Sequence, residues 1–341
     1  MTIKQVVTNG RATRKKITMG GDFPEVRPLE GNEVETGTIS VKGFIDKQKE
    51  FLLTKKLEGL AERTLKDYIN HFQYLNNWIL QEYYEETDIE NRFVDKGLFM
   101  AYIGYMISQF KPATVNIRLR TMKCYLRWLY LEKVLLEDIS AKLKLVKVPK
   151  DTIQPLSTSE VKKIFKTLNL SDYAEYRDFC MMLVMLETGI RVNEACNIMI
   201  VDINIKKKLI IVRSETSKTR EERSLPLSLK TMRYLERLVN VAENNNELYL
   251  FNSSYGGRME TLSVIKNFSK YGKRAGIDHR CTPHIFRHTM AVNSVKAGMD
   301  IFTLQRLLGH NNITTTRQYI QLDTEDLISS HGKANVISRF L

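Results

Sequence analysis

Side chains able to handle a phosphate group gather in the second half of the chain, beginning with Arg191 in TGIRVNE, residues 188–194. Gly189 is expected to end one helix and the residues after it to begin another. Arg191 would then lie at a helix start, where free backbone N–H groups and the helix dipole favour an anion. Its guanidinium offers a fixed fork of donors to two phosphate oxygens. Glu194, three residues on, is placed to orient a neighbour on the same face.

A second arginine stands in TPHIFRHTMA, residues 282–291. His284 and Arg287 are spaced i, i+3 and share one face of a predicted helix, so an imidazole and a guanidinium are offered to one point. His288 is adjacent to Arg287 rather than stacked beside it, and we interpret it as structural or solvent-facing.

Two further segments supply a lysine, a histidine and a tyrosine. Lys218 lies in the polar turn SKTR, residues 217–220, between two predicted strands, where an isolated lysine is usually solvated. His310 follows Leu308-Gly309 at a helix end, and Tyr319 comes nine residues later. A single one of fifteen tyrosines would normally belong to a core. The interest of Tyr319 therefore rests on its position after the other clusters.

Together these residue types indicate phosphoryl transfer carried out by side chains. Two arginines can stabilise the negative charge that develops on the equatorial phosphate oxygens, where other enzymes use Mg²⁺. A tyrosine nucleophile conserves the bond energy in a phosphotyrosyl ester, so that rejoining needs no ATP. Neighbouring arginines would lower the pKa of a lysine and so suit it to act as an acid. The sequence predicts neither a metal ion nor another cofactor.

The composition agrees with a polyanionic partner. The formal net charge is +13, with 25 basic against 19 acidic residues up to residue 150 and 27 against 20 beyond it, so both parts are basic. The four cysteines have no metal-ligand spacing and are expected to be reduced and mostly buried. The chain shows no secretory signal and no apolar stretch of about 20 residues that could cross a membrane. A cytoplasmic protein is expected.

Hydrophobic periodicity predicts four parts of the chain. Residues 1–38 have no apolar periodicity and read as a basic and then acidic tail, with a DNA-touching basic arm as the alternative. Residues 39–148 are helical, with one stripe after a capping Thr64. Residues 149–156, containing Pro149, form a linker. Residues 157–341 combine helices with a small antiparallel sheet. The predicted fold is therefore mainly α with a small antiparallel β-sheet.

One helix of the first domain is unusually basic. Residues 101–150 carry ten basic residues against three acidic ones, which favours a surface that faces phosphates over an ordinary solvated helix face. The candidate DNA contacts are Arg118, Arg120, Lys123 and Arg127.

The motifs together resemble the tyrosine recombinase or phage integrase family, which includes Xer proteins and Cre. TGIRVNE, SKTREERSLPL, TPHIFRHTMA and LGHNNITTTRQY occur in the order of the family and at about its intervals. The resemblance is strongest over residues 157–320. It implies that Arg191 and Arg287 clamp the scissile phosphate, that Lys218 protonates the leaving 5′ oxygen and that Tyr319 attacks. By the same resemblance His284 accepts a proton or a hydrogen bond, His310 binds the non-bridging oxygens, and Glu194 is a supporting residue.

The resemblance also implies an architecture and partners. A helical core-binding domain and a mixed α+β catalytic domain would form a C-shaped clamp on double-stranded DNA. The protein would act as a homo-oligomer, a dimer on each site and a tetramer in the synapse, with strand exchange through a Holliday junction. Residues from about 322 to 341 would dock onto a neighbouring protomer, and DNA-bending or directionality proteins could assist. In the host cell the protein would associate with the nucleoid.

Three matters stay open at this stage. Many relatives have glycines beside the lysine that corresponds to Lys218, whereas this chain has none, so Arg220 is a second candidate in that turn. A type IB topoisomerase or a DNA-binding regulator without catalysis would share part of the pattern. Within the family, a mobile-element integrase and a resolvase are both compatible with the sequence.

Overall fold

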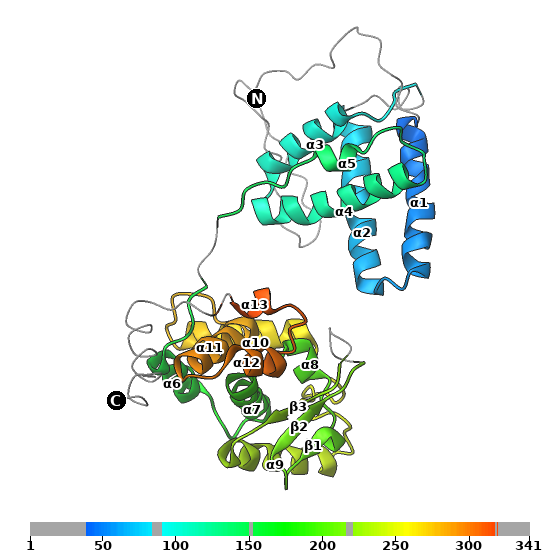
Figure 1. The fold of residues 1–341 in the computed structure, drawn as a ribbon. Helices are drawn as coiled ribbons and strands as arrows, with labels where there is room; N and C mark the ends of the chain where they lie inside the picture. Colours follow the sequence, from blue (N-terminus) through cyan, green and yellow to red (C-terminus); the bar gives the residue numbers. More distant parts are fainter. Residues whose placement is uncertain (1–38, 84–90, 150–152, 216–220, 318, 320–341) are drawn as a thin grey trace, which may run out of the picture. The chain divides into compact units, whose positions relative to one another are not determined.

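A computed structural model describes residues 39–83, 91–149, 153–215, 221–317 and 319. The chain divides into two compact units, Met1–Lys150 and Asp151–Leu341, referred to below as the N-terminal and C-terminal units. The described part is mostly helical and includes a three-stranded antiparallel sheet (Figure 1), which confirms the predicted fold class. No described helix is both long enough and apolar enough to span a membrane.

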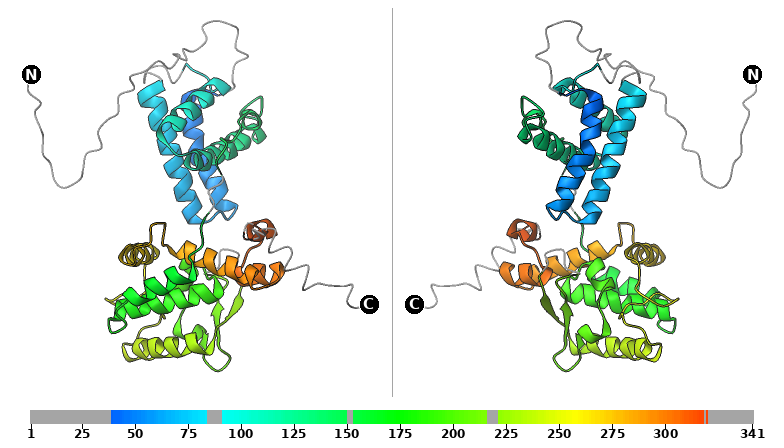
Figure 2. Two further views of the ribbon diagram at one scale, coloured as in Figure 1. Left: turned by 90° about the vertical axis from the view of Figure 1, so that its left-hand side faces the viewer. Right: turned by 90° about the vertical axis from the view of Figure 1, so that its right-hand side faces the viewer.

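The N-terminal unit is built from helices around an aromatic core. The helices are α1 (Val41–Leu57), α2 (Glu62–Trp78), the π-helical turn η1 (Ile79–Tyr83), α3 (Lys96–Gln109), α4 (Pro112–Leu131) and the short α5 (Ile139–Lys142). The helices α1 and α2 lie side by side (Figure 2). In the core, Tyr125 of α4 packs against Phe44, Phe51 and Phe72 and donates its hydroxyl to the backbone oxygen of Phe44 at 2.6 Å.

Side chains cap the first turns of α1 and α3, whereas α2 begins without such a cap. Ser40 and Asp95 accept hydrogen bonds from the backbone N–H groups of Gly43 and Leu98 and so cap α1 and α3. The predicted cap at Thr64 is wrong, because α2 begins two residues earlier, after Ala61, whose side chain makes no cap bond. Helix formation here depends on burial of the apolar stripe rather than on a cap.

The C-terminal unit surrounds the long buried helix α7 (Tyr173–Thr188). This helix packs against α9 (Leu229–Asn244) on one side and against α10 (Thr261–Arg274) and α11 (Pro283–Lys296) on the other (Figure 1). The remaining helices are α6 (Thr158–Thr167), α8 (Val192–Cys196), the 3₁₀ turn η2 (Ile200–Asp202), α12 (Ile301–Leu308) and α13 (Ile313–Arg317). Helix α6 begins with a capping box, in which Ser157 and Glu160 form reciprocal bonds.

The sheet joins three short strands in the order β1 (Ile203–Asn204), β2 (Leu209–Val212) and β3 (Arg223–Pro226). Its register pairs Val212 with Arg223, so the connection between β2 and β3 begins and ends at these two residues. Ile210, Val212 and Leu225 bury their side chains in the core of the unit.

The cysteines are free thiols, as the sequence predicts. Cys180, Cys196 and Cys281 are buried, and Cys124 is partly exposed. Burial raises the pKa of Cys180 to about 12. These three buried thiols therefore serve as small apolar core residues.

Two helical glycines should respond to alanine in opposite ways. A Cβ at Gly272 in α10 would lie 2.3 Å from the Cβ of Cys281, whereas a Cβ at Gly104 in α3 would meet no atom within 4 Å. We expect Gly272→Ala to destabilise its unit by about 2 kcal/mol through overpacking. Gly104→Ala should stabilise its unit by about 0.5–1 kcal/mol, because alanine is the better helix former.

Hydrogen–deuterium exchange across a urea series can follow the two units separately, through peptides from α10 and from α3. Unchanged protection of α10 in Gly272→Ala would contradict the close packing of this helix against Cys281.

Candidate active site

Four helix ends bring the sequence-predicted residues of the C-terminal unit together. Arg191 is the N-cap residue of α8, and Arg287 lies in the first half of α11. His310 follows α12, whose C-cap Gly309 has a φ of +63°, a conformation that favours glycine. Tyr319 follows α13. The contacts described below connect these four side chains into one site.

Arg287 is the most buried of these charged groups, with 5% of its surface exposed. Its Nη1 donates to the backbone oxygen of Gly189, the C-cap of α7. Its Nη2 donates to the backbone oxygen of Leu308 at 2.9 Å and to Nε2 of His310 at 2.7 Å. Burial, together with the charges of Arg191 and Arg223, lowers the pKa of Arg287 to about 10, which still leaves it charged near neutral pH.

Arg191 is held between two helices. Its Nη1 donates to Oε1 of Glu194 at 2.9 Å, and its Nη2 donates to the backbone oxygen of Gly309 at 2.6 Å. Glu194 also accepts the backbone N–H of Arg191 at 3.0 Å. Burial by itself would raise the pKa of Glu194, but Arg223 and Arg191 hold it below its usual range. Glu194 is therefore an ionised carboxylate bonded to both the backbone and the side chain of Arg191.

His310 is a neutral imidazole in this arrangement. Since Arg287 can only donate, Nε2 of His310 accepts from it, and Nδ1 then carries the proton that it donates to Oγ1 of Thr316 at 3.0 Å. Burial and the charges of Arg287, Arg191 and Arg223 lower the pKa of His310 to about 4. The site is thus positively charged through its arginines rather than through this histidine.

Tyr319 lies in a small apolar cluster beside the arginines. Its side chain is 3% exposed and packs with Met290, Leu304 and Leu308, among other residues. Its ring lies nearly parallel to that of His310, at 14° and a centroid distance of 6.3 Å. In this state the candidate nucleophile is beside the candidate phosphate-binding groups but shielded from solvent.

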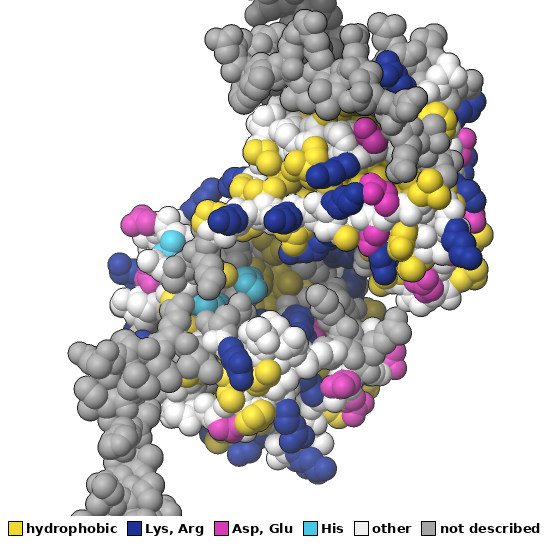
Figure 3. Space-filling model, turned by 45° about the horizontal axis from the view of Figure 1, so that its top comes forward, with side chains coloured by type: hydrophobic (Ala, Val, Ile, Leu, Met, Phe, Trp, Pro, Cys, Tyr) yellow, Lys and Arg dark blue, Asp and Glu magenta, His cyan; other side chains and the backbone are white. Residues whose placement is uncertain are grey.

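The two histidines of α11 lie differently. His284 is exposed, one turn before Arg287 on the same helix, and partial burial together with the charge of Arg287 lowers its pKa. His288 is 6% exposed and its ring lies 5.3 Å from that of Tyr319. Of the two interpretations offered for His288, structural or solvent-facing, its burial supports the structural one. Its contact with Tyr319 could not be foreseen from the helical spacing. Histidine side chains gather on one visible face of the C-terminal unit (Figure 3).

Sequence reasoning also missed Arg223, the first residue of β3. Its guanidinium binds both carboxylate oxygens of Glu194, and 11% of its side chain is exposed. The segment was recognised as a strand, but a charged residue on a short strand is normally solvated. Lys218 and Arg220 lie outside the described residues, as do the tails at residues 1–38 and 320–341.

The four candidate DNA contacts on α4 have different environments. Arg118 is buried between two aromatic rings, 3.8 Å from the centroid of Tyr74 and 4.0 Å from that of Phe110. Lys123 donates to the backbone oxygens of Ser140 and Leu143. These two cations are therefore engaged inside the unit.

Arg120 and Arg127 of the same helix are exposed, although Arg127 also forms an ion pair with Asp138. Lys and Arg side chains form a row across the visible face of the N-terminal unit (Figure 3). The exposed cations of α4 are thus the ones available for an external phosphate.

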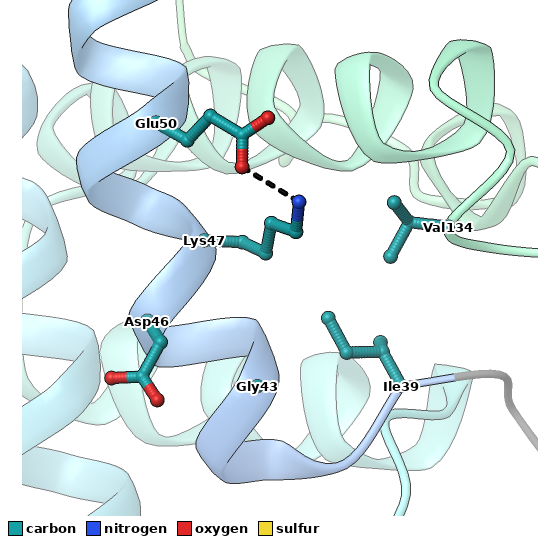
Figure 4. Close-up of a pocket in the computed structure, with 6 residues that line it drawn as sticks. All are labelled: Ile39, Gly43, Asp46, Lys47, Glu50 and Val134. Atoms are coloured by element: carbon teal, nitrogen blue, oxygen red, sulfur yellow. Dashed lines mark hydrogen bonds and ion pairs between the residues drawn. The ribbon is translucent and has the colours of Figure 1, made fainter.

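Two surface pockets lie away from these residues. One pocket of about 450 Å³ in the N-terminal unit is lined by Ile39, Gly43, Asp46, Lys47, Glu50 and Val134, with Lys47 and Glu50 paired at 2.6 Å (Figure 4). Its acidic residues outnumber its single lysine, so it does not suit a phosphate. A second pocket, beside Tyr173 and Asn252, includes none of the candidate catalytic residues. No group of three or more potential metal-ligating side chains occurs among the residues that the structure describes.

Comparisons with known proteins agree on one family. Residues 154–326 match the profile of the phage integrase family. The chain is 31% identical to the tyrosine recombinase XerA of Pyrococcus horikoshii, over 86% of this chain and 95% of that protein. It is 27% identical to the tyrosine recombinase XerD of Vibrio cholerae, over 84% and 94% of the two chains.

Solved structures show the same fold. The integrase of transposon Tn1549, in complex with transposon right end DNA, has a TM-score of 0.69 at 17% identity and covers 87% of this chain and 100% of its own. A lambda integrase dimer bound to a COC′ core site has a TM-score of 0.66 at 19% identity, with 84% and 99% of the chains covered.

Proposed function

The chain belongs to the phage integrase family of tyrosine recombinases, and from this premise we propose that Tyr319 attacks a DNA phosphodiester held by Arg191 and Arg287. The protein is a site-specific DNA recombinase, an enzyme that cleaves and rejoins DNA strands. The observation that carries the assignment of the residues is the connected set of contacts that joins Arg191, Arg287 and His310 and continues to the ring of Tyr319.

The two arginines have donors to spare for a phosphate. A guanidinium has five N–H groups. Arg191 directs two of them, and Arg287 three, to partners among the described residues. The remaining N–H groups can bind the non-bridging oxygens and stabilise the charge that grows on them in the transition state. His310 adds a bond to these oxygens once Arg287 turns towards the phosphate and releases Nε2. The imidazole proton then moves from Nδ1 to Nε2, from which it is donated to the phosphate.

The covalent step exchanges one phosphate ester for another. The hydroxyl oxygen of Tyr319 bonds to phosphorus while its proton leaves, with His284 as the acceptor or hydrogen-bond partner. The bond from phosphorus to the 5′ oxygen breaks, and Lys218 protonates that oxygen. The product is a 3′-phosphotyrosyl ester with a free 5′ hydroxyl. The 5′ hydroxyl of a partner strand reverses the step without ATP, since the ester bond energy has been kept.

The wider assembly follows from the same premise. Residues 39–148 would bind DNA as the core-binding domain, with Arg120 and Arg127 on its phosphate-facing surface, and residues 157–341 would be catalytic. The structural relatives include a lambda integrase dimer bound to a core site and a lambda integrase tetramer bound to a Holliday junction. By analogy we propose a dimer on each site and a tetramer during exchange, with residues 322–341 docking onto the next protomer. A mobile-element integrase or a resolvase is the proposed biological role.

A two-site plasmid assay tests this function. Duplex sites selected from a random library by the purified protein would be placed twice on a supercoiled plasmid. The proposal predicts deletion when the two sites are direct repeats and inversion when they are opposed. Relaxed topoisomers without exchanged segments would instead indicate topoisomerase activity, and bound but uncut DNA would indicate a regulator.

The role of Lys218 can be separated from that of Arg220. We expect Lys218→Ala to slow cleavage by about 10²–10⁴-fold, the usual contribution of a general acid. A substrate with sulfur in place of the 5′ bridging oxygen should restore the rate, because a thiolate leaves without a proton. Arg220→Ala, the matched change two residues on, should keep most of the activity. Rescue of Arg220→Ala rather than Lys218→Ala by sulfur would make Arg220 the acid.

A further inference from the structure

The guanidinium of Arg223, on the short strand β3, forms three hydrogen bonds within the C-terminal unit. Its Nη2 donates to Oε2 of Glu194 at 2.6 Å and its Nη1 donates to Oε1 at 3.2 Å. Its Nε donates to the backbone oxygen of Leu307 at 3.2 Å. The guanidinium is therefore fixed in both position and orientation by a two-point carboxylate pair and a helix end.

Glu194 transmits this order to Arg191. The carboxylate is nearly inaccessible, with 1% of its side chain exposed, and its Oε1 accepts from both Arg223 and Arg191. If Arg191 were the only residue bonded to this carboxylate, the two side chains could shift together. The two bonds from Arg223 fix the carboxylate in place. The direction of the Arg191 guanidinium is thus set partly from β3.

The end of α12 is a second place where the arginines meet. Three consecutive backbone oxygens, those of Leu307, Leu308 and Gly309, accept from Arg223, Arg287 and Arg191 respectively. These carbonyls belong to the negative end of a helix, where cations are stabilised. Gly309 fits this arrangement closely, since a Cβ there would lie 3.1 Å from the guanidinium of Arg223.

We propose that Arg223 is a positioning residue of the recombination reaction, which aims Arg191 at the scissile phosphate through Glu194 and the end of α12. The proposal rests on the function proposed above. Arg223 does not contact the phosphate. It reduces the freedom of a group that does, so its effect belongs to the bond-breaking step more than to DNA binding.

The test compares single-turnover cleavage of a nicked duplex site at saturating protein concentration. We expect Arg223→Ala to lower the cleavage rate about 10–100-fold, as misplacement of a phosphate-binding group does. The dissociation constant for the same DNA should change less than threefold. Arg223→Lys should be intermediate, because one ammonium can reach the carboxylate but cannot bind Leu307 in the same geometry.

A double-mutant cycle identifies the route of the effect. If Arg223 acts through Glu194, the double variant Arg223→Ala/Glu194→Gln should cleave about as slowly as Glu194→Gln alone. The matched control is Arg274→Ala, which removes another two-point arginine–glutamate pair of the same unit, with Glu175, at 2.7 and 2.8 Å. That variant should lose stability without losing cleavage rate per folded molecule.

Each outcome has a distinct reading. A wild-type cleavage rate in Arg223→Ala, or additive losses in the double variant, would overturn the positioning role. If Arg223→Ala does not fold, the same cycle is measured with Arg223→Lys in its place. A wild-type cleavage rate in Arg223→Lys, or additive losses when it is combined with Glu194→Gln, would then overturn the positioning role. Covalent cleavage that persists without the hydroxyl of Tyr319 would instead refute the proposed function, independently of Arg223.

Discussion

Tyr319→Phe is expected to abolish covalent attachment of the protein to DNA while leaving DNA binding nearly unchanged. The substitution removes only the hydroxyl oxygen that forms the new phosphate bond, so no weaker version of the same step remains. The ring of Tyr319 is buried among apolar side chains and lies against those of His310 and His288, contacts that phenylalanine keeps. The fold should therefore tolerate the change.

A nicked duplex that traps the cleaved state measures this effect, because loss of a short 5′ fragment prevents rejoining. Tyr176→Phe is a suitable control, since Tyr176 is a buried tyrosine of the same unit whose hydroxyl donates to a backbone oxygen at 3.0 Å. It should lose about 1 kcal/mol of stability and still form the adduct. Equal adduct yields from Tyr319→Phe and the wild type would exclude Tyr319 as the nucleophile.

Arg287→Lys should reduce the cleavage rate by about 10³-fold or more, the range found when a transition-state arginine or an oxyanion donor is lost. Lysine keeps the charge, but a single ammonium cannot replace the guanidinium bonds to Gly189, Leu308 and His310. The reduction should appear in single-turnover cleavage at saturating protein, with DNA affinity changed much less.

The control for this change is Arg274→Lys, which alters an arginine paired with Glu175 on the surface of the same unit. It should cleave at the wild-type rate. A loss for Arg287→Lys that disappears at higher protein concentration would place Arg287 in binding rather than in the chemical step.

Much of the site could be predicted from the sequence because its residues stand at recognisable helix ends. A glycine marks the end of α7 just before Arg191 and the end of α12 just before His310, and both have positive φ in the structure. The i, i+3 spacing places His284 and Arg287 on one turn. These local signals place each residue at or near a helix end, and the resemblance to the family implies that Arg191, Arg287 and His310 meet.

The remaining features depend on tertiary packing that local patterns do not contain. Arg223 joins the site only because β3 brings it to Glu194, 29 residues earlier in the chain. The basic residues of α4 illustrate the opposite effect. A count of charges cannot tell the exposed Arg120 from Arg118, which the packing of α2 and α4 places against Tyr74.

The burial of Tyr319 likewise has no signal in the sequence. Its neighbours Met290, Leu304 and Leu308 come from α11 and α12, and only the folded arrangement brings them together. Attack on DNA requires the ring to become accessible, so we expect the active state to differ locally from the one described.

The central claim, that Tyr319 becomes covalently joined to DNA, is tested most directly by locating the modified residue. Protein trapped on a nicked site would be treated with nuclease and trypsin and analysed by mass spectrometry. Cleavage after Arg317 and Lys333 gives the peptide QYIQLDTEDLISSHGK, residues 318–333, in which Tyr319 is the only tyrosine. A nucleotide 3′-phosphate on Tyr319 is the predicted result. Attachment at any other residue, or cleaved DNA without a protein adduct, would contradict it.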